Sequence, residues 1–358
     1  MALLILVPSS IIGGHEFQSI EFINQIYKYE KSEISNTFIE CGNKKVLNEI
    51  EFSDVNKDYF EFPQGSLFSL LSQSGFLKKH LEGIIRNKKI HKVMICGGTI
   101  ESIVFYSYLI KSINKNIETI GYVPMVVDKK ILRPLIGVLQ NIILRLACAN
   151  VDTVITINRI QAYLIKEFYN KKSLILPNVV DKLPLVNEDR GKRLVYCGRL
   201  DNIQKNIINL INFLDRHDNP FKDFIIIGGG PEEQLIRSMC SEAKYINIKM
   251  LGWLDTKTLH SHLGCNDVLI MNSRWEGEPL VVREFSSCGL PVIARDIPGF
   301  RGVTFKKYRY QSQADLIKIL NDNFYSFKYK PSLKESLIAS RRERVIAFII
   351  KGQSSEIN

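Results

Sequence analysis

Short runs of β-branched and other apolar residues alternate along the chain with longer segments of helical periodicity, and this alternation restricts the fold more than any other feature. The runs fall at residues 3–7, 92–95, 119–122, 153–157 and 173–176 in the first half and at 193–197, 223–227, 247–251, 267–271 and 291–295 in the second. Strands separated by helices form parallel sheets that helices cover on both faces. The sequence therefore predicts an α/β protein.

Two such series in a chain of 358 residues indicate two doubly wound domains, each with its own core. The break is predicted within residues 177–192, which contain Pro184 and mixed charges but no periodic pattern. We expect an N-terminal domain at 1–180, a C-terminal domain at 181–340 and a C-terminal helix at 341–358. In open α/β sheets ligands bind at the carboxyl ends of the strands. We therefore expect strand-end loops of both domains to face a central cleft.

Composition indicates an ordinary globular protein, with 45% hydrophobic and 24% charged residues. No apolar stretch is long enough to span a bilayer. Residues 1–8 lack the basic region and the cleavage site of a signal peptide, so they are interpreted as a buried strand. The seven cysteines are scattered singly, which argues against a disulfide framework and favours a reducing compartment. The predicted location is the cytoplasm.

The formal net charge is +11, and residues 78–172 carry most of the excess of the first half. These lysines are either solvated surface residues or part of a face that meets anionic lipid or a phosphorylated acceptor. Nucleic acid is disfavoured as a partner because no aromatic residues are interleaved with the charges. Residues 131–149 are strongly apolar but contain Arg133, Gln140, Asn141 and Arg145. They form either a buried core helix or an interfacial amphipathic helix.

Glycine-rich loops follow two of the predicted strands. Gly13 and Gly14 come after the first strand, and residues 228–230, including Gly230, are followed by Pro231. Glycines there allow close approach of a ligand to backbone amides, although structural turns alone explain them equally well. Neither loop has the G-x-G-x-x-G spacing, so a nicotinamide dinucleotide site is disfavoured.

A loop with two cations follows the strand at 193–197. Arg199 and Lys205 lie between this strand and the next helix. A guanidinium fork and a compact ammonium together suit a diphosphate, whereas the alternative is a pair of unrelated surface cations.

The loop at residues 273–284 carries the most specific pattern. Pro279 is well placed at the first turn of a helix, whose free amides would point at an anion. Glu276 lies just before this helix and Glu284 within it. Carboxylates beside a bound diphosphate are expected to accept hydrogen bonds from neutral hydroxyls, one from a sugar and one from a ribose. Glu278 is expected to be a solvated loop residue.

These motifs together resemble a known family. Gly198, Arg199 and Leu200 with Lys205, the glycines at 228–230, the E-x7-E pair Glu276 and Glu284, and residues 288–294 occur in the order found in retaining GT-B glycosyltransferases of family 4, the bacterial glycosyltransferase group 1. The similarity is dense over residues 194–299. It is thinner in the first half, where residues 13–16 resemble the Gly-Gly-x-Glu loop of the family.

The resemblance implies a fold, a reaction and roles for individual residues. The fold would be GT-B, with two Rossmann-like domains and a last helix, at residues 341–350, that crosses back to the N-terminal domain. The enzyme would be a hexosyltransferase that retains anomeric configuration. Donor phosphates would contact Arg199 and Lys205, while Glu276 would bind hydroxyls of the donor sugar and Glu284 those of the ribose. Further donor contacts would come from residues in the strand-end loops and the following helix: Gly13, Gly14, Gly230, Gly252, Gly277, Leu280 and Val281. Neither a cofactor nor a metal is expected, because cations and helix dipoles would stabilise the leaving group.

The acceptor side is less determined. Many members of the family have a histidine at an N-domain strand end, but the corresponding residues 120–125 contain none, and His15 is a candidate substitute. We expect a glycan or polyprenyl-diphosphate-linked acceptor in surface polysaccharide synthesis, such as O-antigen or capsule, with peripheral attachment to the inner face of the cell membrane as one option. The alternatives are a non-catalytic nucleotide-sugar-binding subunit, a sugar-nucleotide epimerase and a phosphorylase.

Overall fold

The computed structural model describes residues 2–9, 13–30, 36–52, 56–63, 72–132, 134–180, 183–216, 220–321 and 335–351. The chain divides into two compact units. Unit 1 comprises Met1–Val179 and Lys334–Asn358, and unit 2 comprises Val180–Leu333. Residues 10–12 of the predicted first glycine loop, and 352–358 of the predicted last segment, lie outside the described residues.

Unit 1 is built on a parallel sheet in the order β3-β2-β1-β4-β5-β6-β7. The strands of this sheet are β1 (Ala2–Val7), β2 (Thr37–Cys41), β3 (Lys57–Tyr59), β4 (Ile90–Ile95), β5 (Glu118–Tyr122), β6 (Thr153–Thr156) and β7 (Ser173–Ile175). Its helices are α1 (Gly14–Glu30), α2 (Lys44–Asn48), α4 (Ser74–Asn87), α5 (Ile100–Ile113), α6 (Lys129–Leu132), α7 (Pro134–Ala147), α8 (Arg159–Tyr169) and α15 (Glu335–Lys351), with a 3-10 turn η2 (Cys148–Asn150).

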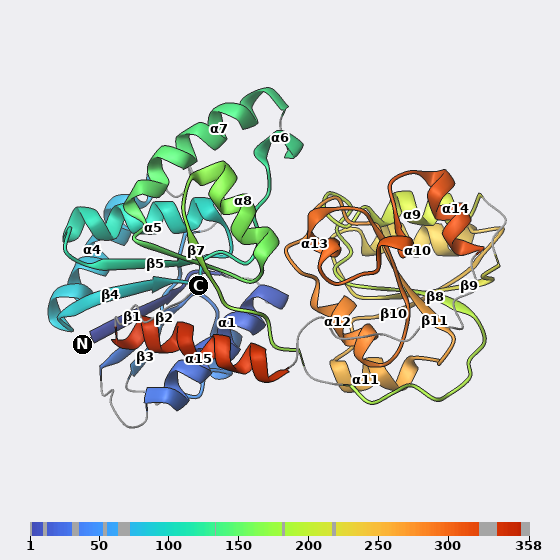
Figure 1. Ribbon diagram of the computed structural model, residues 1–358, viewed down its shortest axis with the longest axis horizontal. Coiled ribbons are helices and arrows are strands. Elements are labelled where there is room, and N and C mark those ends of the chain that lie inside the picture. Colours follow the sequence, from blue (N-terminus) through green and yellow to red (C-terminus); the bar gives the residue numbers. More distant parts are fainter. Residues whose placement is uncertain are drawn as a thin grey trace. The chain divides into compact units, whose positions relative to one another are not determined.

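Strand β1 shows why the sequence folds in this way. All six of its residues are buried, and their side chains alternate between the two faces of the sheet. Leu4 and Leu6 belong to the core beneath α4, α5 and α8, whereas Leu3 and Ile5 belong to the core beneath α1 and α15. Figure 1 shows these two groups of helices on opposite sides of the sheet. A strand of this kind must be apolar throughout because both of its faces are covered.

Helix α15, the last described segment, packs in unit 1. Its residues Val345, Ile346 and Ile349 are buried in the core that contains α1. Arg342 donates to Pro177 O at 2.6 Å and to Gln25 Oε1 at 2.6 Å.

Unit 2 contains a second parallel sheet in the order β10-β9-β8-β11-β12-β13. The strands are β8 (Arg193–Cys197), β9 (Asp223–Ile227), β10 (Asn247–Gly252), β11 (Asp267–Met271), β12 (Val292–Arg295) and β13 (Arg309–Tyr310). Figure 1 shows α9 (Ile207–Leu214), α10 (Glu233–Glu242) and α14 (Gln313–Leu320) on one side of this sheet and α11 (Thr256–His262) and α12 (Leu280–Ser287) on the other. The short helix α13 (Pro298–Arg301) and the turn η3 (Lys306–Tyr308) follow β12. The prediction of two doubly wound α/β domains is confirmed.

Three strands escaped the sequence pattern, namely β2, β3 and β13. Strand β2 contains a buried glutamate, Glu40, in place of an apolar residue. Strand β3 is a short edge strand with two charged residues, and β13 has only two residues. None of them has the apolar run that identified the others.

Glu40 is a carboxyl group in an apolar setting. Its Oε2 lies 3.2 Å from His80 Nε2 on α4, and the His80 ring stacks on Phe60 with centroids 3.7 Å apart. Burial, and then the charge of Asp58, raise the pKa of Glu40 to about 7. At neutral pH this side chain therefore holds a proton for much of the time.

The raised pKa of Glu40 predicts that the substitution Glu40→Gln increases the stability of the protein in a pH-dependent way. Folded Glu40 binds its proton more tightly than unfolded Glu40, so its contribution to stability falls as pH rises from 4.5 through 7. At pH 8 we expect the variant to be more stable than the parent by about 1–3 kcal/mol, with no difference near pH 4.5. Thermal unfolding at both pH values measures this difference. Glu51→Gln, at a half-exposed carboxylate of unit 1, is the control.

Candidate functional site

The strand order of unit 2 creates a place where loops from neighbouring strands diverge. From β8 the chain moves outward to β9 and β10, and it then returns to place β11 on the other side of β8. The loops that leave β8 and β11 therefore start side by side and run to opposite faces of the sheet. Such reversal points are the usual ligand sites of open α/β sheets. These two loops contain the predicted residues Arg199, Lys205 and Glu276.

The glycines of three strand-end loops allow those loops to pack against each other. A Cβ on Gly228 would lie 1.9 Å from the carbonyl oxygen of Gly198, and one on Gly230 would lie 2.5 Å from Leu200 O. Gly228 N also donates to Gly252 O at 2.7 Å. Close contact between backbones is thus a sufficient reason for glycine at 228 and 230. The position of Gly252 is different, since it has φ of +73° and a Cβ there would meet no atom within 4 Å.

The close contact at Gly228 predicts a selective loss of stability. Gly228→Ala would force the loops after β8 and β9 apart, and it would also strain a backbone with φ of +142°. We expect a loss of about 2–4 kcal/mol, measured by urea unfolding. The matched control is Gly229→Ala, because the nearest atom there is a flexible carboxylate oxygen of Glu233 at 3.5 Å. Equal effects at 228 and 229 would contradict this explanation.

Lys205 and Glu276 form an ion pair at the reversal point. Lys205 Nζ contacts Glu276 Oε1, and the two side chains are only 13% and 7% exposed. Ser273 Oγ donates to the same carboxylate oxygen at 2.7 Å. Buried charges are stable only when they are paired and hydrogen-bonded, and this carboxylate meets both conditions. The two groups that the sequence assigned to a diphosphate and a sugar thus hold each other.

Gln204 connects Arg199 to this pair. Arg199 Nη2 donates to Gln204 Oε1 at 3.0 Å and lies 3.0 Å from Asp201 Oδ2. The amide of Gln204 in turn donates to Trp275 O at 3.2 Å. Half of the Arg199 side chain is exposed, so its guanidinium keeps donors available for a ligand.

Glu284, which lies on α12, influences the pKa of a residue at the end of β8. Burial first, and then the charge of Glu284, raise the pKa of Cys197 to about 12, while Lys205 acts in the opposite direction. Burial likewise raises the pKa of Tyr196, an effect that Glu276 increases and Arg199 reduces. Tyr196 and Cys197 are the last residues of β8. Each of the four predicted charged residues therefore influences the pKa of Tyr196 or Cys197 at the end of β8, and two of them, Lys205 and Glu276, are in direct contact.

Helix α12 begins at Leu280, directly after Pro279, which adopts φ of −72° and ψ of 118°. Leu280 and Val281 form its first turn, where amide groups point away from the helix. Gly299 in α13 packs against the loop that precedes α12, since a Cβ on Gly299 would lie 2.3 Å from Glu276 O. The predicted helix N-terminus is therefore present, and Glu276 is held on its backbone side as well as at its carboxylate.

The expectation that Glu278 is solvated is wrong. Its side chain is only 10% exposed, and its Oε1 accepts from Arg283 Nη1 at 2.9 Å. Arg283, five residues further along the chain in α12, neutralises this carboxylate.

Arg274 and Asn206 help to hold the two loops of the site together, and the sequence pattern did not reveal this role. Arg274 donates to the carbonyl oxygens of Asn202 at 2.9 Å and Ile203 at 2.7 Å, and to Asn206 Oδ1 at 2.8 Å. Asn206 has a left-handed backbone with φ of 54° and precedes α9. Arg274 thereby fastens the loop after β11 to the loop after β8. Hydrogen bonds from a side chain to distant carbonyl groups leave no pattern in a sequence.

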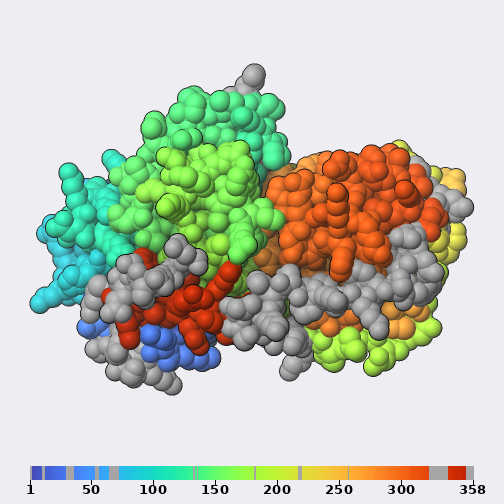
Figure 2. Space-filling view, in the orientation of Figure 1, coloured from blue at the N-terminus to red at the C-terminus, as the bar shows by residue number. Residues whose placement is uncertain are grey.

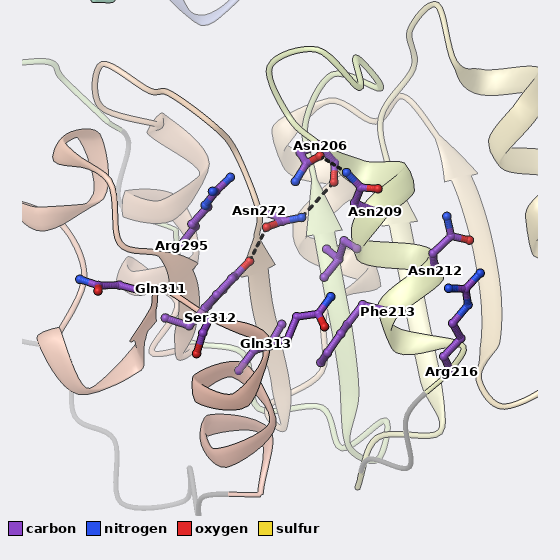
Figure 3. Close-up of a pocket in the computed structure, with 13 residues that line it drawn as sticks. Asn206, Asn209, Asn212, Phe213, Arg216, Asn272, Arg295, Gln311, Ser312 and Gln313 are labelled. Atoms are coloured by element: carbon purple, nitrogen blue, oxygen red, sulfur yellow. Dashed lines mark hydrogen bonds between the residues drawn. The ribbon is translucent and has the colours of Figure 1, made fainter. Parts of the chain in front are cut away.

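A polar pocket of about 540 Å³ lies behind this network, between α9 and the start of α14 (Figure 3). Its inner wall is Asn272, which accepts from Tyr310 Oη at 2.8 Å and donates to Asn206 O at 3.0 Å. Asn209, Asn212 and Arg295 line it further out. The chain of contacts from Tyr310 through Asn272 supports the backbone of Asn206, next to Lys205.

In unit 1 the corresponding reversal point lies between β1 and β4. Gly13 precedes α1, and Gly14 is already its first residue. His15 stacks on Tyr122 at the end of β5, with ring centroids 5.6 Å apart, and Gly98 leaves room for its ring. Both ring nitrogens are buried, and burial lowers the pKa of His15, an effect that Glu16 partly offsets. The neutral imidazole of His15 thus lies beside Tyr122, which belongs to residues 120–125, the stretch that contains no histidine.

Two absences apply to the part of the chain that the structure describes. No group of three or more His, Cys, Asp or Glu side chains there could hold a metal ion. No described helix combines the length and the apolar character needed to cross a membrane.

Most of unit 2 is similar to a known protein family. Residues 182–315 match the sequence model of the family described as "Glycosyl transferases group 1". Unit 2 carries a glycosyltransferase group 1 domain. This match confirms the prediction of a glycosyltransferase domain, and it includes Arg199, Lys205, Glu276 and Glu284.

A related sequence comes from Klebsiella pneumoniae, where it is described as an uncharacterized 41.2 kDa protein in the cps region. It is 27% identical to this chain over 172 residues, which are 46% of this chain and 46% of that protein. The aligned part is thus less than half the length of the relative.

Solved structures of glycosyltransferases share the fold along nearly the whole chain. The lipopolysaccharide outer core galactosyltransferase WaaB, in its apo form, has a TM-score of 0.65 at 16% identity and covers 96% of this chain and 94% of its own. Sucrose-phosphate synthase of Thermosynechococcus elongatus has a TM-score of 0.68 at 14% identity, with coverage of 98% and 95%. The pneumococcal O-GlcNAc transferase GtfA, solved with UDP and GlcNAc, has a TM-score of 0.57 at 10% identity, with coverage of 98% and 93%. The two units of this chain therefore have the GT-B fold.

Proposed function

We propose that this protein is a retaining glycosyltransferase of family 4 that moves a hexose from a nucleoside-diphosphate sugar to a glycan or lipid-linked acceptor. The observation that carries the proposal is the buried contact between Lys205 and Glu276 at the reversal point, to which Gln204 joins Arg199 and beside which α12 carries Glu284. Two cations suit a diphosphate, and two carboxylates suit the hydroxyls on either side of it. These residues lie within the glycosyltransferase group 1 domain.

Binding of the donor would exchange partners within the site. Lys205 would turn from Glu276 to the phosphate oxygens, and the half-exposed Arg199 would join it there. Glu276 would then be available to accept hydrogen bonds from sugar hydroxyls while Ser273 continues to orient it. The first turn of α12 would add its helix dipole, which favours an anion at that end.

The proposed reaction breaks the bond between the anomeric carbon and the phosphate oxygen. The acceptor oxygen forms a bond to the same face of that carbon, and the departing phosphate takes the acceptor proton. Arg199 and Lys205 stabilise the negative charge that develops on the leaving nucleoside diphosphate, which is the main catalytic effect expected. In this scheme Gly13 and Gly14 of unit 1 contribute donor contacts, and His15 belongs to the acceptor side.

Surface polysaccharide synthesis is the proposed setting. Its support is the relative described by its place in a cps region and the shared fold of a lipopolysaccharide galactosyltransferase. An acceptor of this kind would be a growing glycan or a polyprenyl diphosphate carrying sugars.

The ion pair allows the role of these residues to be separated from their effect on folding. Lys205→Ala and Glu276→Ala each leave a buried charge without its partner, whereas the double variant leaves neither. We expect kcat/KM to fall by about 10²- to 10⁴-fold in all three variants, while only the single ones lose stability. Release of nucleoside diphosphate from a panel of UDP-, GDP-, ADP- and dTDP-sugars, with membrane extract as acceptor, measures the rate.

Arg237→Ala is the matched control, because Arg237 is an exposed cation of unit 2 that pairs with Glu233 on α10. Turnover that survives in the Lys205 and Glu276 double variant would refute the assignment. A parent protein that binds donor without turning it over would be a non-catalytic subunit. Isomerised donor without acceptor would indicate an epimerase, and phosphate-dependent release of sugar phosphate would indicate a phosphorylase.

We also propose that transfer proceeds without a divalent metal, since Arg199 and Lys205 supply two positive charges to the diphosphate. Excess EDTA is therefore expected to leave the rate unchanged, and Mg²⁺ or Mn²⁺ should not increase it more than about twofold. A rate that falls with EDTA and returns with Mn²⁺ would show that a metal takes part.

A further inference from the structure

Helix α7 presents an apolar face that no described part of unit 1 covers. Ile136, Leu139, Ile143 and Leu146 recur at intervals of three and four residues, and each is at least 50% exposed. Val138 and Ile142 of the same helix and Ile131 of the preceding α6 are also exposed, and we term these residues together the α7 face. The sequence allowed either a buried core helix or an interfacial helix here, and these exposures exclude the fully buried one.

The helix itself is firmly held. It packs against α5, α6 and α8, and Leu144 on its inner side belongs to the core. Gly137 lies close to the backbone of Lys129, where a Cβ would be 2.4 Å from the carbonyl group. Figure 1 shows α7 at the outside of unit 1, beyond α5 and α8, and Figure 2 shows its teal-green surface open to the solvent. The α7 face is therefore a fixed surface of the folded unit.

An exposed aliphatic stripe of this size is unusual in a protein that has no partner for it. Residues 129–151 contain four basic residues and no acidic one. Lys130 and Arg145 are exposed, and Lys129 is paired with Glu101. The surface is thus aliphatic, with one exposed cation before α7 and one in its last turn. Protein interfaces are instead enriched in aromatic residues and methionine, which the α7 face lacks among its described side chains.

We propose that the α7 face docks on an anionic lipid bilayer, with the helix lying in the plane of the interface. Its isoleucine and leucine side chains would enter the boundary between headgroups and acyl chains, and Lys130 and Arg145 would contact lipid phosphates. This inference rests on the proposed function and deepens it. A polyprenyl-linked acceptor is held in the bilayer, so docking of the α7 face would bring the enzyme to its acceptor.

Vesicle flotation tests the docking surface without any need for turnover. We expect the parent protein to float with vesicles of phosphatidylcholine and phosphatidylglycerol at low salt, and to do so less at high salt or with phosphatidylcholine alone. Leu139→Gln with Ile143→Gln should lower the bound fraction about tenfold or more. Lys130→Gln with Arg145→Gln should lower it about five- to thirtyfold on anionic vesicles.

Leu185→Gln with Leu235→Gln is the matched control, because these leucines of unit 2 are 65% and 52% exposed, similar to the pair on α7. It should bind vesicles as the parent does. Three results would each overturn the proposal: a parent that ignores both kinds of vesicle, α7 variants that bind unchanged, or a parent dimer that the α7 variants convert to a monomer. The last would make the face an interface between copies.

Release of nucleoside diphosphate, measured on the same samples, separates the two proposals. Turnover without vesicle binding would refute the docking surface and leave the proposed transferase activity intact. Vesicle binding without turnover of any donor would refute the proposed function and leave the docking surface intact.

Discussion

The candidate site of unit 2 depends on the side-by-side pairing of β8 and β11. This pairing is secured at the opposite end of the two strands, where Arg193 donates to both oxygens of the fully buried Asp267 at 2.8 and 2.7 Å. Burial raises the pKa of Asp267, and the hydrogen bonds and charge of Arg193 offset that effect in part. The bidentate pair therefore fixes the register of the strands at their amino ends. Since both strands are parallel, their carboxyl ends must then release two loops at a common point.

The side chains of these two loops meet because the loops start at a common point. The loop after β8 is shaped by backbone contacts at Gly228 and Gly230, and Arg274 fastens it to the loop after β11. Lys205 and Glu276, one from each loop, then meet and neutralise each other. Their pairing offsets part of the desolvation cost of burying the two charges. In the proposed function a diphosphate, which carries more negative charge than one carboxylate, would take Lys205 from its partner.

Much of this could be predicted from the sequence, since buried parallel strands must be apolar on both faces and their loops must meet at one edge. The ten apolar runs correspond to strands of the two sheets, and the residues singled out in four loops lie at strand ends. The prediction from sequence failed where tertiary contacts determine the environment of a residue. Glu40 in β2 breaks the apolar run, Glu278 is paired with Arg283 and largely removed from solvent, and Arg274 binds carbonyl groups that are distant in sequence. Residues 131–149 were ambiguous for the same reason, because apolar periodicity does not tell whether a neighbour covers the helix.

The return of the chain to unit 1 has a consequence for how the protein is made. The ammonium group of Lys92 is buried, and it has Ile349 O at 2.7 Å and Glu118 at 3.0 Å as partners. While the ribosome has not yet released α15, this group lacks its carbonyl partner and the core beside α1 lacks three of its aliphatic side chains. Unit 2 is a single continuous segment and has no such dependence. The half of the protein that is translated first is therefore completed last, against the usual order in which domains mature during synthesis.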